Sequence, residues 1–248
     1  MDRFSRTKTL LGSNRFHQLS TSYVVVVGLG AVGGYVVEGL VRGGIGRLKL
    51  VDFDLVSRTN INRQLLALET TLHRPKSEVA LERAQDINPA CQVQTSQVFV
   101  DEETVQAVLD PVPDLLIDAI DALNPKVQLL TAAFRQGIPI LSSMGAALRT
   151  DPGKITFADI SKTYGCPLAK RVRKRLRKQG IEQGIGCVYS SESVDFIYEG
   201  PMVDMESPQK WRGRQRNVLG SLPTITGIFG LVLANQAILH LAGAADSW

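Results

Sequence analysis

With 248 residues, the chain can bury one sizeable core and still carry an appended subdomain. Hydrophobic residues make up 44% of the sequence and charged residues 21%, which is typical of a globular protein and argues against long disordered regions. The formal net charge is +4, and seven of the nine residues from Lys170 to Lys178 are basic, a run that forms either a solvated helix face or a site for anions and nucleic acids.

The cysteines are few and widely spaced, at Cys91, Cys166 and Cys187. Because they form no CxxC pair, the sequence indicates neither a zinc site nor a disulfide framework. The N-terminal segment MDRFSRTKTLLGSNRF contains no apolar stretch of the kind that secretion signals carry. We therefore expect a cytoplasmic protein without bound zinc.

Apolar runs alternate with helical patterns along the first half of the chain, which predicts parallel βα units. The expected strands are Tyr23–Val27, Leu48–Val51, Val93–Val98, Leu115–Asp118 and Ile138–Ser142. The expected helices are Ala31–Arg42, Glu78–Ile87, a short helix capped by Asp101, and Pro125–Arg135. Several of these strands are apolar throughout, as strands covered on both faces should be. The predicted fold class is α/β, with a mostly parallel Rossmann-like sheet flanked by helices.

The pattern changes after Asp151-Pro152-Gly153, so we divide the chain into a nucleotide-binding region, 1–150, and a smaller α+β extension, 151–248, within one integrated domain. Pro167 is expected to begin a helix that ends at Gly180 and docks through Leu168, Val172 and Leu176. Further strands are expected at Lys154–Asp159 (antiparallel), Gly186–Ser190 and Val194–Tyr198, with a mobile loop at Glu199–Asn217.

The segment from Val218 to Ala245 is apolar and long enough to span a bilayer, with His240 as its only ionisable side chain. Polar residues and Pro223 interrupt it, and its glycines suit tight helix packing. We expect a buried or dimer-interface helix, and peripheral membrane attachment is the alternative.

A glycine motif of the nucleotide-binding kind, Gly28-Leu29-Gly30-Ala31-Val32-Gly33, follows the first predicted strand and begins a helix. Gly28 allows the tight turn, Gly30 lets phosphates approach the backbone, and Gly33 allows close packing. The helix N-terminus then presents N–H groups and a positive dipole end to an anion. Asp52, at the end of the next strand, is placed to bind ribose hydroxyls. The motif alone does not distinguish ATP from NAD.

The polar residues between Asp52 and Lys76 favour ATP. A nicotinamide site needs an apolar slot, whereas triphosphate chemistry needs cations around the phosphates and a carboxylate for magnesium. The segment places acidic, amide and cationic groups beside one pocket: Asp52, Asp54, Asn60, Arg63, Gln64 and Lys76. We therefore expect ATP and Mg²⁺ as the bound species.

Two aspartates of the segment DAIDALNPK come at the end of the fourth expected strand. Asp121 lies at the carboxyl edge of the sheet, where ligands of open α/β sheets bind, and it either holds a metal or caps the next helix. Asp118 is still within the strand, so a structural role is at least as well supported as a catalytic one.

A resemblance to a known fold is carried by five motifs: GLGAVGG, DFDLVSRTNINRQ, RPKSEVA, INPACQV and DAIDALNPK. Together they resemble the adenylation fold of ubiquitin-activating enzymes and their bacterial sulfur-carrier relatives, and RFSRTKTLLG resembles that superfamily's N-terminal arginine segment. Within the superfamily the chain is most similar to the tRNA threonylcarbamoyladenosine dehydratase family, through VRGGIGRLKLVDFD, DAID, PLAKRVRKRLRK, GCVYSSE and the apolar C-terminal segment. The similarity covers nearly the whole chain.

The resemblance implies roles for individual residues. Asp52 would bind the ribose, Asn60, Arg63 and Lys76 the phosphates, and Asp121 the magnesium ion. Cations at these positions suit the reaction, because attack on the α-phosphate builds negative charge.

The resemblance also implies a homodimer, in which Arg6 reaches the ATP of the neighbouring subunit. The implied reaction is ATP-dependent cyclisation of N6-threonylcarbamoyladenosine in tRNA through an adenylated carboxylate, with release of AMP and diphosphate. A sulfur-relay protein is a further partner that the family allows. The basic helix suits a tRNA backbone, and the residues expected to contact it are Lys170, Arg171, Arg173, Lys174 and Arg177.

The sequence departs from its relatives at two points. Sulfur-carrier adenylating enzymes often have paired zinc cysteines, which this chain lacks. Some dehydratases have a cysteine near the start of the C-terminal helix, where this chain reads Asn217-Val218-Leu219-Gly220. A covalent cysteine step at that position is excluded, and for Cys187 we expect structural burial.

Three other functions remain as alternatives. An activator of a sulfur-carrier or ubiquitin-like protein is disfavoured by the basic helix and the missing cysteine pairs. A regulatory nucleotide-binding module without chemistry is disfavoured by the presence of Arg63, Lys76 and Asp121 together. A dehydrogenase is disfavoured by the polar NINRQ segment.

Overall fold

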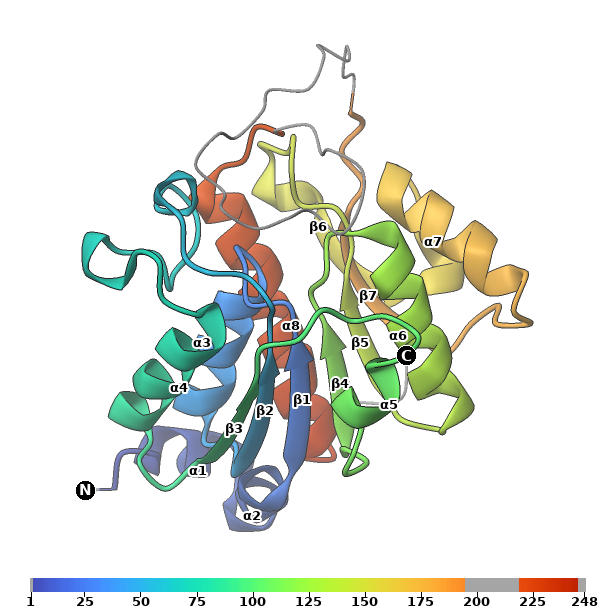
Figure 1. Cartoon of the computed structure of the whole chain (residues 1–248). Coiled ribbons are helices and arrows are strands. Elements are labelled where there is room, and N and C mark those ends of the chain that lie inside the picture. The colour runs from blue at the N-terminus through green and yellow to red at the C-terminus, as the bar shows by residue number, and fades with distance from the viewer. Residues whose placement is uncertain (1, 195–218, 245–248) are drawn as a thin grey trace.

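A single sheet of seven strands organises the computed structural model, which describes residues 2–194 and 219–244 (Figure 1). The strand order is β3-β2-β1-β4-β5-β7-β6, and every pairing is parallel except the antiparallel pairing of β6 with β7. The strands are β1 (Tyr23–Val27), β2 (Arg47–Val51), β3 (Gln92–Ser96), β4 (Leu115–Asp118), β5 (Ile140–Ser143), β6 (Ile155–Asp159) and β7 (Gly186–Ser190). The strands of the 151–248 extension therefore join the sheet of the first region.

The centre of the sheet is a topological switch point, because β1 pairs with β2 on one side and with β4 on the other. The register places Val27 beside Val51 and beside Asp118, so these strands end at the same edge. The loops that leave β1 and β4 meet there, which is where ligands of open α/β sheets bind.

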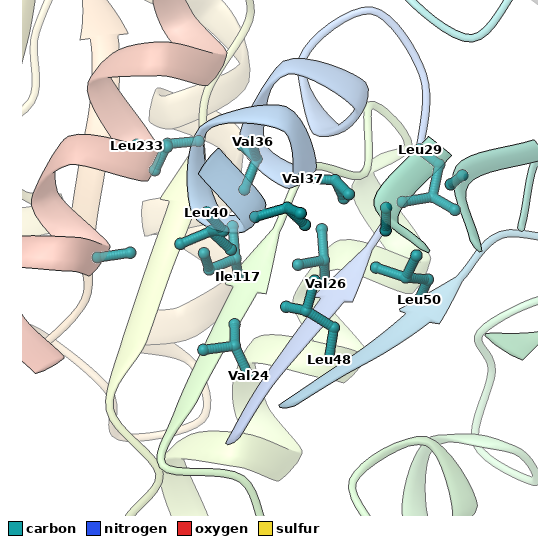
Figure 2. Packing of buried hydrophobic residues seen from close by; sticks show 14 of the residues in the cluster. Val24, Val26, Leu29, Val36, Val37, Leu40, Leu48, Leu50, Ile117 and Leu233 are labelled. Atoms are coloured by element: carbon teal, nitrogen blue, oxygen red, sulfur yellow. The ribbon is translucent and has the colours of Figure 1, made fainter. Parts of the chain in front are cut away.

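Helices cover both faces of the sheet, and two buried clusters form between the layers. One cluster packs α3 (Gly33–Gly43), α4 (Lys76–Ile87) and α8 (Pro223–Leu241) on the sheet, and the other packs α5 (Val105–Val108), α6 (Leu123–Arg135) and α7 (Pro167–Arg177). Figure 2 shows the first cluster, with Val36 and Leu40 of α3 and Leu233 of α8 close to the strand residues Val26 and Ile117.

The C-terminal helix α8 lies directly against α3. A Cβ atom added at Gly39 would lie 2.6 Å from Cβ of Ala234, and one added at Gly43 would lie 2.7 Å from Cδ1 of Ile238, so the close approach requires glycine. The helix has the length and composition of a membrane span, with a mean hydropathy of 1.5, but 44% of that window is buried inside the protein. One face of the helix is buried, as expected, while its outer face carries apolar side chains such as Leu231, which is 49% exposed; a dimer interface at that face stays a prediction.

Most expected elements are present, with shifted ends. Helix α3 begins two residues later than expected, α6 begins two residues earlier, and β5 begins at Ile140 rather than at Ile138. The docking stripe of α7 consists of the buried residues Ala169, Val172 and Leu176, while Leu168 is only half-buried. Of the strand expected at Val194–Tyr198, only Val194 is described, outside any strand, and the loop expected at Glu199–Asn217 lies outside the described residues.

Two N-terminal helices, α1 (Ser5–Leu11) and α2 (Ser13–Thr21), were not anticipated. Phe16 and Leu19 of α2 are buried, and Phe16 packs against Phe4 at a ring-centroid distance of 5.7 Å. The same two rings border Gly44, at the end of α3 that is remote from the glycine motif. Figure 1 shows α1 and α2 at the amino edge of the sheet.

Candidate active site

The glycine loop after β1 has one position that is open and two that are tightly enclosed. Gly28 has φ +90°, and a Cβ atom there would lie 2.8 Å from the carbonyl oxygen of Ala119. A Cβ atom at Gly33 would lie 1.7 Å from the carbonyl oxygen of Gly28. At Gly30 the nearest atom is Nε2 of Gln64, 3.8 Å away. The fold itself therefore requires Gly28 and Gly33, whereas Gly30 leaves space above the loop for a ligand to approach the backbone.

Asp52 lies beneath this loop and is 7% exposed. Its carboxylate accepts a 2.6 Å hydrogen bond from the backbone N–H of Leu29 and a 2.8 Å bond from that of Asp54. Burial raises the pKa of this carboxyl, and the charge of Lys76 opposes the shift. Asp52 thus fixes the glycine loop to the end of β2. A carboxylate has four lone-pair positions, so its expected ribose contact is compatible with both bonds and stays a prediction.

Lys76, the first residue of α4, is 4% exposed and points toward the end of β2, where Nζ donates to Oδ2 of Asp54 at 3.0 Å. Burial alone would lower the pKa of Lys76, but the carboxylates of Asp52 and Asp54 outweigh this effect and raise it above the ordinary value. Asp121 adds to the same attraction. Lys76 therefore keeps its positive charge at neutral pH, inside a group of carboxylates at the carboxyl edge.

The NINRQ segment lies beside the glycine loop. Asn60 closes a short 3₁₀ turn by accepting a 3.2 Å hydrogen bond from the N–H of Ser57, and the Arg63 guanidinium donates to the carbonyl of Thr59 at 2.8 Å. Oε1 of Gln64 is buried and has no hydrogen-bond partner among the described residues. Gln64 is thus an acceptor next to the open position at Gly30, whereas Asn60 and Arg63 are held by local bonds.

Asp121 lies in the loop between β4 and α6 and is exposed at the carboxyl edge. Its charge adds to the attraction that raises the pKa of Lys76, so it acts on the same group of charges. Within residues 2–194 and 219–244, no three His, Cys, Asp or Glu side chains are grouped to hold a metal ion. Magnesium commonly binds through one or two carboxylates together with substrate phosphates and water, and the expected role of Asp121 as its ligand stays a prediction.

The sequence-based reasoning missed one feature of the site, a buried ion pair of Lys126 with Asp118. Both side chains are 0% exposed, and they form a direct hydrogen bond. A signal was available, because Lys126 occupies the same helical stripe as the buried residues Leu129, Leu130 and Ala133. A lysine in such a stripe, eight residues after a strand-end aspartate, indicates a buried pair.

Arg6 lies far from the glycine loop of its own chain. It is exposed on α1, and its neighbour Arg3 donates a 2.6 Å hydrogen bond to the carbonyl of Ile87, at the C-terminal end of α4. Helices α3 and α4 begin at the nucleotide edge, and an eleven-residue helix such as α3 is about 16 Å long. Arg6 is thus at the opposite end of the helix layer from the nucleotide loop of its own chain, and its expected role in the site of the neighbouring subunit stays a prediction.

The basic helix α7 presents most of its charges to solvent. Lys170, Arg171, Lys174 and Arg177 are exposed. Arg173 differs, because its guanidinium donates to the carbonyl of Thr163 at 2.7 Å and also to the hydroxyl of Thr163. Of the five residues expected to contact tRNA, Arg173 is therefore the one engaged within the fold.

The cysteines are all buried as free thiols. Burial raises the pKa of Cys91 to about 11 and raises that of Cys187 well above its ordinary value. Thiols that stay protonated at neutral pH are poor nucleophiles, so the structure supports a packing role for Cys187.

The fold and the site define a nucleotide-binding α/β protein in which a charged lysine and several carboxylates surround the space beside a phosphate-type loop. The family model described as "ThiF family" matches residues 4–247. This chain belongs to the ThiF family.

Two members of the family, both named as dehydratases, are similar to this chain over nearly its full length. The Bacillus subtilis (strain 168) protein named tRNA threonylcarbamoyladenosine dehydratase is 37% identical over 241 residues, covering 97% of this chain and 95% of that protein. The Escherichia coli tRNA N6-threonylcarbamoyladenosine dehydratase, TcdA, has been solved in complex with AMP and with ATP, with TM-scores of 0.84 and 0.83. In both structures TcdA is 32% identical to this chain, and the match includes 97% of this chain and 94% of the TcdA chain.

A relative with a different name matches a shorter part of the chain. The molybdopterin-synthase adenylyltransferase of Haemophilus influenzae is 32% identical over 186 residues, covering 71% of this chain and 75% of that protein. The expected resemblance to the dehydratase family is thus confirmed over nearly the full length, and the similarity to the molybdopterin-synthase adenylyltransferase extends over less of the chain.

Proposed function

We propose that this protein is an ATP-dependent dehydratase that cyclises N6-threonylcarbamoyladenosine in tRNA. The observation that carries the proposal is the similarity to the Bacillus subtilis and Escherichia coli dehydratases over 97% of the chain. The site is compatible with it, because the glycine loop, Lys76 and Asp121 meet at one edge of the sheet.

The reaction removes one molecule of water in two steps. An oxygen of the threonyl carboxylate attacks the α-phosphorus of ATP, and the bond to the diphosphate leaving group breaks. A nucleophile within the modification then attacks the carbonyl carbon and closes the ring, while AMP leaves with the oxygen of the original carboxylate. The net change converts ATP into AMP and diphosphate.

Lys76 is assigned to the phosphates in the first step. Negative charge grows on the phosphate oxygens as the carboxylate attacks, and a fixed cation in a partly dehydrated site stabilises that charge most strongly. The raised pKa of Lys76 keeps this cation present at neutral pH. Arg63 is assigned to the same phosphates, which requires its guanidinium to exchange the Thr59 carbonyl for a phosphate oxygen.

The nucleotide itself would lie over the glycine loop. The open space at Gly30 suits a phosphate at the N-terminus of α3, and Asp52 and Asp54 at the end of β2 suit the ribose. Gln64 offers its unpaired Oε1 to a donor group of the nucleotide. Asp121 would hold a magnesium ion, which neutralises phosphate charge and orients the leaving diphosphate when it is bound.

The active unit is proposed to be a homodimer in which Arg6 completes the site of the partner subunit. The location of α1, the helix that contains Arg6, at the amino edge of the sheet supports a contribution in trans, because this edge is remote from the glycine loop of the same chain. The exposed apolar face of α8, which includes Leu231, is proposed to take part in the dimer contact. We place the enzyme in the cytoplasm with its tRNA substrate.

The tRNA backbone is proposed to lie along α7. The exposed side chains of Lys170, Lys174 and Arg177 face away from the buried stripe of that helix and are available to phosphates. Arg173 has a smaller share in this surface, since Thr163 holds it.

The alternative function is activation of a sulfur-carrier or ubiquitin-like protein, which the similarity to molybdopterin-synthase adenylyltransferase favours. The deciding experiment incubates the enzyme with ATP and Mg²⁺ and measures AMP formation with tRNA that contains the modification, with unmodified tRNA, and with a carrier protein that ends in Gly-Gly. We expect AMP only with the modified tRNA. AMP formation with the carrier protein alone would replace the proposal by its alternative.

A further inference from the structure

Lys126 is one of the largest side chains that are fully buried in the described structure. Lysine is seldom fully buried, and taking two charges out of water costs more than the attraction of an ion pair usually returns. Apolar residues of similar volume often serve stability equally well in such positions. The Lys126–Asp118 pair therefore calls for an explanation other than stability.

The pair connects three elements at the carboxyl edge. Nζ of Lys126, on α6, donates to Asp118 at the end of β4, to Oγ of Ser142 at 3.2 Å and to the carbonyl oxygen of Ser143 at 3.0 Å, both on β5. The Ser142 hydroxyl in turn donates to Oδ2 of Asp118 at 2.6 Å. The three N–H donors of the ammonium group are thus satisfied, so the cluster is fully hydrogen-bonded and rigid.

The remaining oxygen of Asp118 controls the backbone that follows. Oδ1 accepts a 3.0 Å hydrogen bond from the N–H of Ile120, the residue immediately before Asp121. On the other side of Asp121, the N–H of Lys126 donates to the carbonyl of Ala122 at 3.2 Å. Asp121 lies between these two fixed backbone positions, and the first of them depends on the side chain of Asp118, which Lys126 holds.

The same loop also borders the nucleotide loop. The N–H of Ala119 donates to the carbonyl of Val27 at 2.8 Å, and the carbonyl of Ala119 occupies the space that a side chain at Gly28 would need. A shift of the β4–α6 loop would therefore move Asp121 relative to the glycine motif. Lys126 and Asp118 have no exposed surface, so they cannot touch a nucleotide themselves.

We infer that Lys126, through Asp118, is a positioning residue that holds Asp121 in place for magnesium beside the phosphates. The inference rests on the proposed metal role of Asp121. Residues that orient a metal ligand through hydrogen bonds typically change metal affinity by about 10–100-fold when they are replaced. The effect of losing the pair should therefore appear in the magnesium requirement.

The test replaces both charges at once, as Asp118→Leu/Lys126→Met, because removing one partner alone would leave a buried charge unpaired. AMP formation with modified tRNA is measured over a range of Mg²⁺ concentrations, together with thermal unfolding. Leu130→Ala is the matched control, since Leu130 is a fully buried residue of the same helix that the cluster does not include. We expect the half-maximal Mg²⁺ concentration to rise at least about tenfold in the double variant and to stay unchanged in the control.

Ser142→Ala is a milder variant that removes one hydrogen bond from the cluster, and it serves if the double variant does not fold. We expect it to raise the magnesium requirement at least twofold. Suppose that Asp121→Asn raises the half-maximal Mg²⁺ concentration, whereas the folded double variant or Ser142→Ala keeps the wild-type value. That result would overturn the inference and leave the metal role of Asp121 standing. If Asp121→Asn itself needed no more magnesium, the metal assignment and the inference would both be overturned.

Discussion

Gly30 and Gly33 belong to one loop, yet adding a methyl group should have opposite consequences at the two positions. At Gly33 the new Cβ would lie 1.7 Å from the carbonyl oxygen of Gly28, which is a backbone atom of the turn itself. Over-packing of a core costs about 1–3 kcal/mol when side chains can adjust, and a backbone collision costs more. At roughly 2–4 °C per kcal/mol for a chain of this size, Gly33→Ala should lower Tm by about 10 °C or more, or fail to fold.

At Gly30 the nearest atom is 3.8 Å from the added methyl group, and φ lies outside the left-handed region. Gly30→Ala should leave Tm within about 2 °C of the wild type, because the substitution meets no steric barrier and reduces the freedom of the unfolded chain. The methyl group would stand where a phosphate approaches the backbone. The Kd for ATP should therefore rise at least about tenfold, which corresponds to ~1.4 kcal/mol.

Thermal unfolding without ligand and isothermal titration with ATP and with NAD, at a fixed Mg²⁺ concentration, measure both effects. The wild type should bind ATP and show no appreciable NAD binding. If Gly30→Ala bound ATP as tightly as the wild type, the loop would not be the phosphate site. A wild-type Tm for Gly33→Ala would refute the packing of the turn, and tight NAD binding with no ATP signal would end the adenylation proposal.

Three further predictions concern charged residues. Burial alone would raise the pKa of Glu38, but hydrogen bonds from Arg83 and Arg42 outweigh burial and bring the pKa below 4.5. Glu38→Gln should therefore lower the free energy of unfolding by about 1–2 kcal/mol at neutral pH. In urea unfolding this loss should persist down to about pH 4.5 and vanish as the pH falls through the lowered pKa of the folded state, and a constant loss at all pH values would contradict it. Mixed dimers of Arg6→Ala and Lys76→Ala subunits should recover partial activity, because one site keeps both residues, and no recovery in verified heterodimers would refute the contribution in trans. Replacement of Lys170, Lys174 and Arg177 on α7 by Gln should weaken tRNA binding and lower the slope of log K against log salt concentration by about 0.7–0.9 per lost contact, with ATP affinity and Tm unchanged. An unaltered slope would show that the RNA-binding surface lies elsewhere.

The sequence predicted the sheet because apolar runs and turn residues are local signals. The bounds of β1, β4 and β7 match the expected ones, since each is a short apolar run whose burial on both faces leaves little choice of structure. The helices α1 and α2 were missed because their sequences are polar and their few buried residues, such as Phe16, form no extended stripe. Their packing depends on a surface that only the finished fold provides.

The candidate site was predicted as a set of residues and not as a set of contacts. Asp54 and Lys76 were both expected beside the ATP pocket, but their 3.0 Å pairing depends on a tertiary approach of two segments 22 residues apart in the chain. Arg173 was expected to face outward with the rest of its helix, and Thr163, which comes before that helix, holds it instead. Such pairings follow from the turns between elements, and those turns carry no periodic signal.

The contact between α3 and α8 has a consequence for how the protein is made. Helix α3, which follows the nucleotide loop, leaves the ribosome well before α8, the helix that covers it. At about 5–20 residues per second, the interval is roughly ten to forty seconds. During that time the face of α3 at Gly39 and Gly43 lacks the helix that covers it in the folded protein, and transiently exposed apolar surface of this kind is prone to aggregation. Helix α8 also packs against the nucleotide loop, since a Cβ atom added at Gly230 would lie 2.5 Å from the carbonyl oxygen of Val32, so the packing around that loop is complete only after α8 has been translated.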